Sequence, residues 1–265
     1  MCALPTALGA SSCLVAEAIG QLGGWVAIAH SAFRDRPIPA LIGRVKLLET
    51  LCAGDLLELE VELERLDRGP RGAVLMRGRA TKGGRSLLEL GDCLSPLFPL
   101  EEFDDPGLAR ARFALLCTPD SGPEAGAFDW AAAAGDPMLE LAPERVAAEG
   151  EPAASLRAEL LLPDESVIFD DHFPRRPVLP ASLLLDQVAR LAVSLAGAPG
   201  RAPVVRAACI GPVKLRAFVA PGSRLEIVVS ARPGALAGRV FDGRATLADR
   251  LVANATIEVE RGGTP

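Results

Sequence analysis

Apolar and polar positions divide the chain into two similar halves. Residues 13–29 contain a single charge and are apolar nearly all round, which predicts a helix enclosed by other structure. Segments such as 56–63 then alternate apolar and polar residues between Gly-Pro and Gly-Gly turns, as half-buried strands do. The second half repeats this order, with a helix over 180–197 and an alternating segment at 224–229. Each half therefore fits a sheet wrapped around one buried helix.

Internal sequence matches indicate that the two halves arose by duplication. Residues 42–47 (IGRVKL) match 210–215 (IGPVKL) at an offset of 168 (210 − 42). Residues 78–81 and 243–246 both read GRAT, at an offset of 165 (243 − 78), and the two apolar helices superpose at about 169. Several matched features in one order are typical of a repeated structural unit.

The two halves differ at their starts. Two strand-like stretches, 138–146 and 155–162, precede the second helix, whereas only about ten residues precede the first. The first repeat is therefore expected to lack its opening hairpin, either truly or because the recorded start is internal. The resulting domain prediction is an N-terminal repeat over 1–98, a linker over 99–136 with a short helix near 108–116, and a C-terminal repeat over 137–261.

Composition narrows the possible functions. The net charge of −6 argues against a nucleic-acid partner, because phosphate neutralisation needs a dense basic surface. No uninterrupted apolar span reaches about 18 residues, since Glu17 interrupts the first helix, so we expect no membrane partner. The six cysteines lack CxxC spacing, which favours reduced thiols in a cytoplasmic protein. With only two histidines and no clustered cysteines, a metal site is not expected.

The segment with most chemical information is 172–180, which reads HFPRRPVLP and leads directly into the second apolar helix. Each proline fixes its own φ and restricts the residue before it, so this loop can hold the His172 imidazole in a defined position. Asp186 follows on the helix fourteen residues later. A preorganised base near a carboxylate is what acid/base chemistry requires.

These residues resemble the 3-hydroxyacyl-[acyl-carrier-protein] dehydratase family. The match covers 138–260 well and 11–95 more faintly, and the sequence differs from the family at two positions, where Ala181 replaces a Gly and Arg190 a Gln. The resemblance implies an α+β double hot-dog, in which two antiparallel sheets each wrap a central helix and the repeats pair as a pseudo-dimer. The residues that match the family motif are His172, Phe173, Pro177, Val178, Pro180 and Asp186.

The resemblance also implies an activity. Family members convert 3-hydroxyacyl thioesters on acyl carrier protein to 2-enoyl thioesters, which would place this chain in fatty-acid or polyketide synthesis. The substrate is carried on phosphopantetheine, and no metal or redox cofactor is needed. Two alternatives remain open: a hot-dog thioesterase, and a catalytically silent subunit that binds an acyl carrier. Pairs of chains could also associate as homodimers.

The same resemblance raises the question of which carboxylate works with His172. In the family, the histidine of one hot-dog faces the acid of its partner, so in a fused pair the acid should come from the first repeat. Counting back 169 from Asp186 gives Glu17, and Gln21 preserves the family spacing four residues on. A lone carboxylate in an apolar helix favours the protonated form that a general acid needs.

Asp186 has a second interpretation. With Arg190 it has the i, i+4 spacing of an ordinary helix ion pair, so its catalytic and structural roles both stay open. The position reciprocal to His172 is Ala3, so the second site is predicted to be empty.

The remaining candidates would bind substrate. The N–H of Ala181 at the helix start would stabilise the enolate-like oxygen. The arginines would meet a pantetheine phosphate or an acidic carrier protein, with solvated loop charges as the alternative. The substrate-binding candidates are Gln21, Phe173, Arg175, Arg176, Pro180 and Ala181.

Overall fold

The computed structural model describes residues 12–49, 55–67, 72–118, 136, 138, 142–145, 155–197, 205–234 and 239–261. The first half contains α1 (Ser12–His30), β1 (Asp35–Pro37), β2 (Leu41–Leu47), β3 (Glu58–Asp67), β4 (Ala73–Lys82) and β5 (Arg85–Pro99). Between the halves lie a 3-10 turn, η2 (Leu100–Glu102), and α2 (Pro106–Leu116). The second half contains β6 (Glu144–Arg145), β7 (Ser155–Leu161), α3 (Val167–His172), α4 (Ala181–Ala196), β8 (Val205–Leu215), β9 (Arg224–Ala231), β10 (Val240–Leu247) and β11 (Arg250–Arg261).

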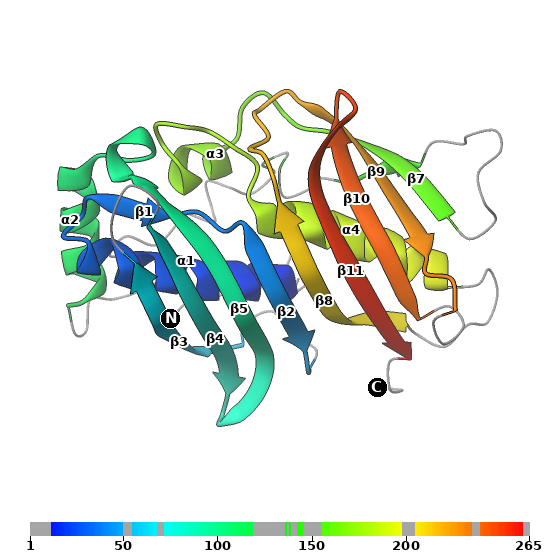
Figure 1. Ribbon diagram of the computed structural model, residues 1–265, viewed down its shortest axis with the longest axis horizontal. Coiled ribbons are helices and arrows are strands. Elements are labelled where there is room, and N and C mark those ends of the chain that lie inside the picture. Colours follow the sequence, from blue (N-terminus) through cyan, green and yellow to red (C-terminus); the bar gives the residue numbers. More distant parts are fainter. Residues whose placement is uncertain are drawn as a thin grey trace.

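The strands form one continuous antiparallel sheet rather than two separate ones. Its order is β3-β4-β5-β2-β8-β11-β10-β9-β7-β6, with β1 paired to β5. The repeats join where β2 pairs with β8, and Ile42 lies opposite Val213 while Val45 lies opposite Ile210. Residues matched at an offset of 168 thus exchange partners, as expected around a two-fold axis. The double hot-dog prediction is confirmed, and the two sheets prove to be edge-joined (Figure 1).

Each central helix lies on the same side of this sheet and touches the other helix (Figure 1). The duplicated GRAT segments explain how closely each helix approaches the sheet. A Cβ built on Gly78 would lie 2.3 Å from Ile19 Cγ2 of α1, and one built on Gly243 would lie 2.3 Å from Val188 Cγ1 of α4. Ile19 and Val188 are themselves 169 positions apart (188 − 19). Both repeats therefore use a glycine to let the helix contact the sheet.

The two half-sheets differ at their outer edges in the part of the chain that the structure describes. In the second repeat β7 pairs with β9, and β6 pairs with β7. Among the described residues no strand lies beyond β3, the counterpart of β9. Of the predicted strand at 138–146, β6 covers residues 144–145, and the predicted reciprocal position Ala3 lies outside the described residues.

Among the described residues, α1 is less enclosed than α4. By length and composition, Cys13–His30 is apolar enough to cross a membrane, and only 33% of that window is buried. It nevertheless packs against β3, β4, β5 and α4, which is the place of the core helix in a hot-dog repeat. On α4, by contrast, most residues between Ser182 and Ala192 are buried.

The helix α2 packs against the C-terminal end of α1, at the position where a helix is predicted near 108–116. The Asp105 side chain caps it by accepting the N–H groups of Gly107 and Leu108. On its inner face the Phe113 ring lies 6.2 Å from Trp25 and 5.7 Å from Phe33, centroid to centroid. These contacts bring α2 to one end of the site described next.

Candidate active site

His172 is the last residue of a short capped helix, and not part of the loop predicted from the sequence. Ser166 accepts the Ile168 N–H and donates its hydroxyl to Asp136, which also accepts the Val167 N–H. The resulting helix α3 is one short segment that ends at His172. Caps of this kind satisfy backbone groups that the first helical turn leaves unpaired.

Beyond His172 the loop is held by an aromatic cluster. Phe173 and Val178 are buried with Phe103, and the Phe173 and Phe103 ring centroids lie 5.1 Å apart in an edge-on contact. Arg36 of β1 covers the other side, with its guanidinium carbon 4.4 Å from the Phe173 ring centre and Nη2 3.5 Å from the His172 carbonyl oxygen. The first repeat therefore helps to position the histidine of the second.

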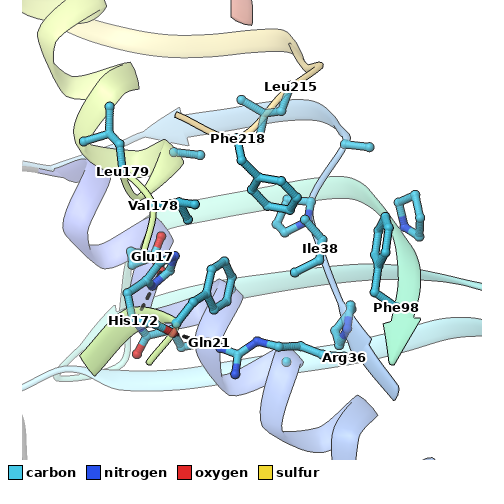
Figure 2. Close-up of a pocket in the computed structure, with 18 of the residues that line it drawn as sticks. Glu17, Gln21, Arg36, Ile38, Phe98, His172, Val178, Leu179, Leu215 and Phe218 are labelled. Atoms are coloured by element: carbon cyan, nitrogen blue, oxygen red, sulfur yellow. Dashed lines mark hydrogen bonds and ion pairs between the residues drawn. The ribbon is translucent and has the colours of Figure 1, made fainter. Parts of the chain in front are cut away.

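The carboxylate that faces His172 belongs to Glu17 of α1. Glu17 Oε1 lies 3.6 Å from His172 Nδ1, and the Gln21 amide donates to the same oxygen over 3.2 Å (Figure 2). The His172 side chain is 13% exposed and that of Glu17 is 23% exposed, so both remain accessible to a small molecule. At 3.6 Å the imidazole and the carboxylate are too far apart for a good direct hydrogen bond. Both side chains line the same cavity, so the two groups can face one bound molecule from adjacent positions.

Asp186 lies elsewhere and has another partner. Its Oδ2 accepts a hydrogen bond from Arg190 Nε over 2.6 Å, the i, i+4 pair that the sequence allows. It does not line the cavity around His172. The cavity therefore brings His172 together with Glu17, whereas Asp186 pairs with Arg190.

A cavity of about 440 Å³ surrounds the pair of His172 and Glu17, and both repeats line it. Three of the predicted substrate-binding residues, Gln21, Phe173 and Ala181, belong to its wall. Because Ala181 begins α4, its N–H has no acceptor within the helix. The other contributors include Gly20, Gly24, Trp25, Ile28, Ile38, Phe98, Val178, Leu179, Leu184, Leu215, Phe218, Val219, Val252 and Ala253.

The other three predicted binding residues lie outside this wall. Pro180 does not line the cavity. Arg175 donates to Asp105 over 2.7 Å, and Arg176 lies 3.7 Å from Glu102. Both arginines are thus engaged in ion pairs on the surface of the connecting segment.

Sequence reasoning missed the arginines that do line the cavity, Arg36 and Arg112 in particular. Arg36 stands in a three-residue strand, and Arg112 stands in the segment interpreted as a linker. Neither position carries a motif or a periodic signal, so only the folded contacts of the first repeat and α2 reveal them.

Burial raises the pKa of the Cys93 thiol to about 11, so at neutral pH it is a neutral thiol and a poor nucleophile. Within the described ranges, no group of three His, Cys, Asp or Glu side chains is arranged to hold a metal ion.

Comparison with known proteins relates the second half of the chain to dehydratases. Residues 148–245 match the model of the ApeI-like dehydratase family. A curated 3-hydroxyacyl-[acyl-carrier-protein] dehydratase of Rhizorhabdus wittichii is 36% identical over 93 residues, which cover 33% of this chain and 58% of that protein. The match thus spans less than two thirds of the relative's length.

Solved structures reproduce the whole fold at low sequence identity. A MaoC-like dehydratase superposes with a TM-score of 0.56 at 15% identity, covering 98% of this chain and 84% of the other. A 12:0-ACP thioesterase from Umbellularia californica gives a TM-score of 0.54 at 10% identity, covering 98% of this chain and 93% of the other. This chain is therefore a double hot-dog protein, and its C-terminal half is similar in sequence to the ApeI-like dehydratases and to a 3-hydroxyacyl-[acyl-carrier-protein] dehydratase.

Proposed function

We propose that the chain removes water from 3-hydroxyacyl thioesters carried by an acyl carrier protein, giving 2-enoyl thioesters in fatty-acid or polyketide synthesis. The observation that carries this proposal is the pair formed by His172 and Glu17, which face each other across 3.6 Å in one cavity. A base and an acid so placed can act on adjacent carbons of one bound substrate. The dehydratase match of the half that contains His172 supports the same reaction.

In the proposed mechanism the neutral His172 imidazole takes a proton from the carbon next to the thioester carbonyl. Glu17 in its acid form protonates the hydroxyl on the following carbon, the C–O bond breaks, and water leaves as the double bond forms. The first N–H groups of α4, beginning at Ala181, stabilise the negative charge that develops on the carbonyl oxygen. The reaction transfers no electrons to an acceptor, so the proposal includes no metal or redox cofactor.

Turnover ends with His172 protonated and Glu17 ionised. Because their nearest ring nitrogen and carboxylate oxygen are 3.6 Å apart, a small movement or one intervening water can return the proton to Glu17. The Gln21 amide holds the receiving carboxylate in place through its 3.2 Å hydrogen bond. We expect this cycle to run in the cytoplasm, with substrates delivered by a soluble carrier protein.

The test is to incubate the protein with a 3-hydroxyacyl thioester and follow the absorbance of the enoyl product. His172→Ala and Glu17→Gln should each lower kcat by roughly 10²- to 10⁴-fold, the usual contribution of a general acid or base. Asp186→Asn is the matched carboxylate control and should retain activity, because Asp186 pairs with Arg190 away from the cavity. Activity that survives both of the first two substitutions contradicts the proposal.

The same assay separates the competing functions. Release of free thiol without enoyl product would identify a thioesterase instead, an activity hosted by the same fold in the Umbellularia californica protein. Tight binding of acylated carrier protein without turnover would identify a silent binding subunit.

A further inference from the structure

The position of His172 depends on a helix that is too short to be stable by itself. Helix α3 has six residues, and isolated helices shorter than roughly 12 residues are marginal in water. Its N-cap, Ser166, lies about 9 Å from His172 along the helix, at about 1.5 Å per residue. A change at the start of α3 can therefore move the imidazole at its end.

One buried carboxylate, that of Asp136, holds the polar groups at this start. Its Oδ1 accepts the Ser166 hydroxyl over 2.8 Å, and its Oδ2 accepts the Val167 N–H over 2.9 Å. The same Oδ1 accepts the N–H of Met138 over 2.9 Å, which ties the carboxylate to its own segment. Asp136 is 8% exposed and Met138 is 1% exposed, so both are anchored inside the fold. Hydrogen bonds to an ionised carboxylate are stronger than those between neutral groups.

The middle of α3 is held by contacts of a different kind. Phe169 is buried in the main core, and Ile168 packs against the same core. Apolar contacts are non-directional, so they keep the helix against the core without fixing its rotation. The hydrogen bonds of Asp136 are directional, and they fix where the helix begins.

The residues that follow His172 are also held by the segment between the repeats. The Arg175 N–H donates to the Phe103 carbonyl over 3.0 Å, and the Arg175 guanidinium donates to Asp105 over 2.7 Å. Both side chains of this ion pair are half exposed, and exposed ion pairs contribute little stability. The segment 99–136, predicted as a linker, thus contacts the chain on both sides of His172, and Asp136 provides the buried contact.

We propose that Asp136 is a positioning residue for His172, which it holds opposite Glu17 through the Ser166 cap of α3. This inference rests on the proposed function, because it concerns the base of that reaction. Asp136 does not line the cavity, and Glu17 is held separately on α1, so a shift of α3 changes the distance between the base and the acid. The expected signature is a lower kcat with a nearly unchanged KM.

The first variant, Ser166→Ala, removes the capping hydroxyl and leaves Asp136 in place. It should lower kcat in the enoyl absorbance assay about tenfold and change KM by less than about twofold, since small misplacements of a catalytic group are costly. Ser166→Thr retains a capping hydroxyl and should keep kcat within about twofold of the wild type. Asp136→Asn replaces one accepting oxygen by an amide group that cannot accept, so it should lower kcat at least as much as Ser166→Ala.

The matched control is Thr256→Ala in the same repeat. Thr256 is buried, and its hydroxyl donates to Asp242 over 3.2 Å, so this variant loses a hydroxyl-to-carboxylate contact of the same kind between β11 and β10. It should lower the melting temperature without lowering kcat. If Asp136 had only a structural role, Ser166→Ala would give this pattern too.

A second measurement does not need turnover, so its outcome is independent of the proposed function. Diethyl pyrocarbonate modifies histidines, and mass spectrometry of peptides gives the rates at the only two in the chain, His172 and the exposed His30 at the end of α1. Ser166→Ala and Asp136→Asn should each raise the rate at His172 about fivefold relative to His30, the usual effect of losing an N-cap on helix opening. The His172 side chain is 13% exposed in the closed helix, and Thr256→Ala should leave the ratio of the two rates unchanged.

A modification ratio that stays at the wild-type value in both Ser166→Ala and Asp136→Asn overturns the proposal, whatever happens to kcat. A loss of kcat that Thr256→Ala reproduces, or that Ser166→Thr shows to the same extent as Ser166→Ala, overturns it as well. If the wild-type protein forms no enoyl product, the proposed function fails, while the modification ratio still decides whether Asp136 positions His172.

Discussion

Gly78→Ala should damage both the stability and the site of this protein, because Gly78 is where α1 contacts the sheet. The added methyl group would lie 2.3 Å from Ile19 Cγ2 and 2.9 Å from the Glu60 carbonyl oxygen. Ile19 is completely buried and lies two residues from Glu17, so it cannot move aside into solvent. The strain must instead move α1 away from β4.

The size of this effect follows from the distances. Restoring an ordinary contact of 3.4 Å requires a separation of about 1.1 Å (3.4 − 2.3). Overpacking of this kind typically costs about 1–3 kcal/mol of unfolding free energy. A displacement of about 1 Å in a catalytic group can lower the rate by roughly 10²-fold, and Glu17 moves with the helix.

Urea unfolding followed by tryptophan fluorescence measures the first quantity, and the enoyl absorbance assay measures the second. Gly91→Ala is the control within the sheet, because its nearest neighbour, the Arg44 carbonyl oxygen, is at 3.7 Å. Combining Gly78→Ala with Ile19→Ala should recover about 0.5–3 kcal/mol relative to the sum of the single changes, since the shorter contact, with Ile19 Cγ2, is removed while the contact with the Glu60 carbonyl remains. Strict additivity, or a loss no larger than that of Gly91→Ala, would refute the proposed contact.

Three further predictions concern single side chains. Arg232 donates to Asp242 and holds the pKa of that carboxyl below its usual range, so the pair stabilises the fold above about pH 4, and this stabilisation is lost as the pH falls further. Since the pair is half exposed, Asp242→Asn should lower the unfolding free energy by at most about 1 kcal/mol at pH 7 and by nothing near pH 2 in urea titrations. A maleimide reagent at pH 7 should modify exposed Cys117 while leaving Cys93 intact until the protein unfolds, as mass spectrometry of peptides would show, because burial keeps the Cys93 thiol protonated. Arg36→Gln removes the cation that covers the histidine loop, so it should lower kcat by about tenfold while changing the melting temperature by no more than a few degrees. An unchanged kcat would mean that the loop holds its position without Arg36.

The fold was predictable because the duplication shows the same pattern of an apolar helix followed by alternating strands in both halves of the sequence. The apolar helix over 13–29 and the one over 180–197 correspond to α1 and α4, and the GRAT match marked the two glycines that face them. The joining of the half-sheets was not predicted. Pairing between β2 and β8 depends on the outer edges of two strands far apart in sequence, and alternation within a strand does not identify its neighbour.

The candidate site was predictable only in part. The offset between Glu17 and Asp186, combined with the rule that partner subunits share a site, indicated which carboxylate faces His172. The cavity arginines could not be found this way. Arg36 and Arg112 reach the cavity through β1 and α2, elements that have no counterpart in the duplicated pattern and so offer no offset to count.

Joining the two repeats in one chain has a consequence for dilute solution. In a site shared by two separate chains, the active fraction falls as the protein is diluted below the dissociation constant. Here Glu17 and His172 are held together by the polypeptide and by the pairing of β2 with β8, so their effective concentration does not depend on how much protein is present. The specific activity should therefore stay constant down to nanomolar protein, and each chain carries a complete pair of groups wherever it diffuses.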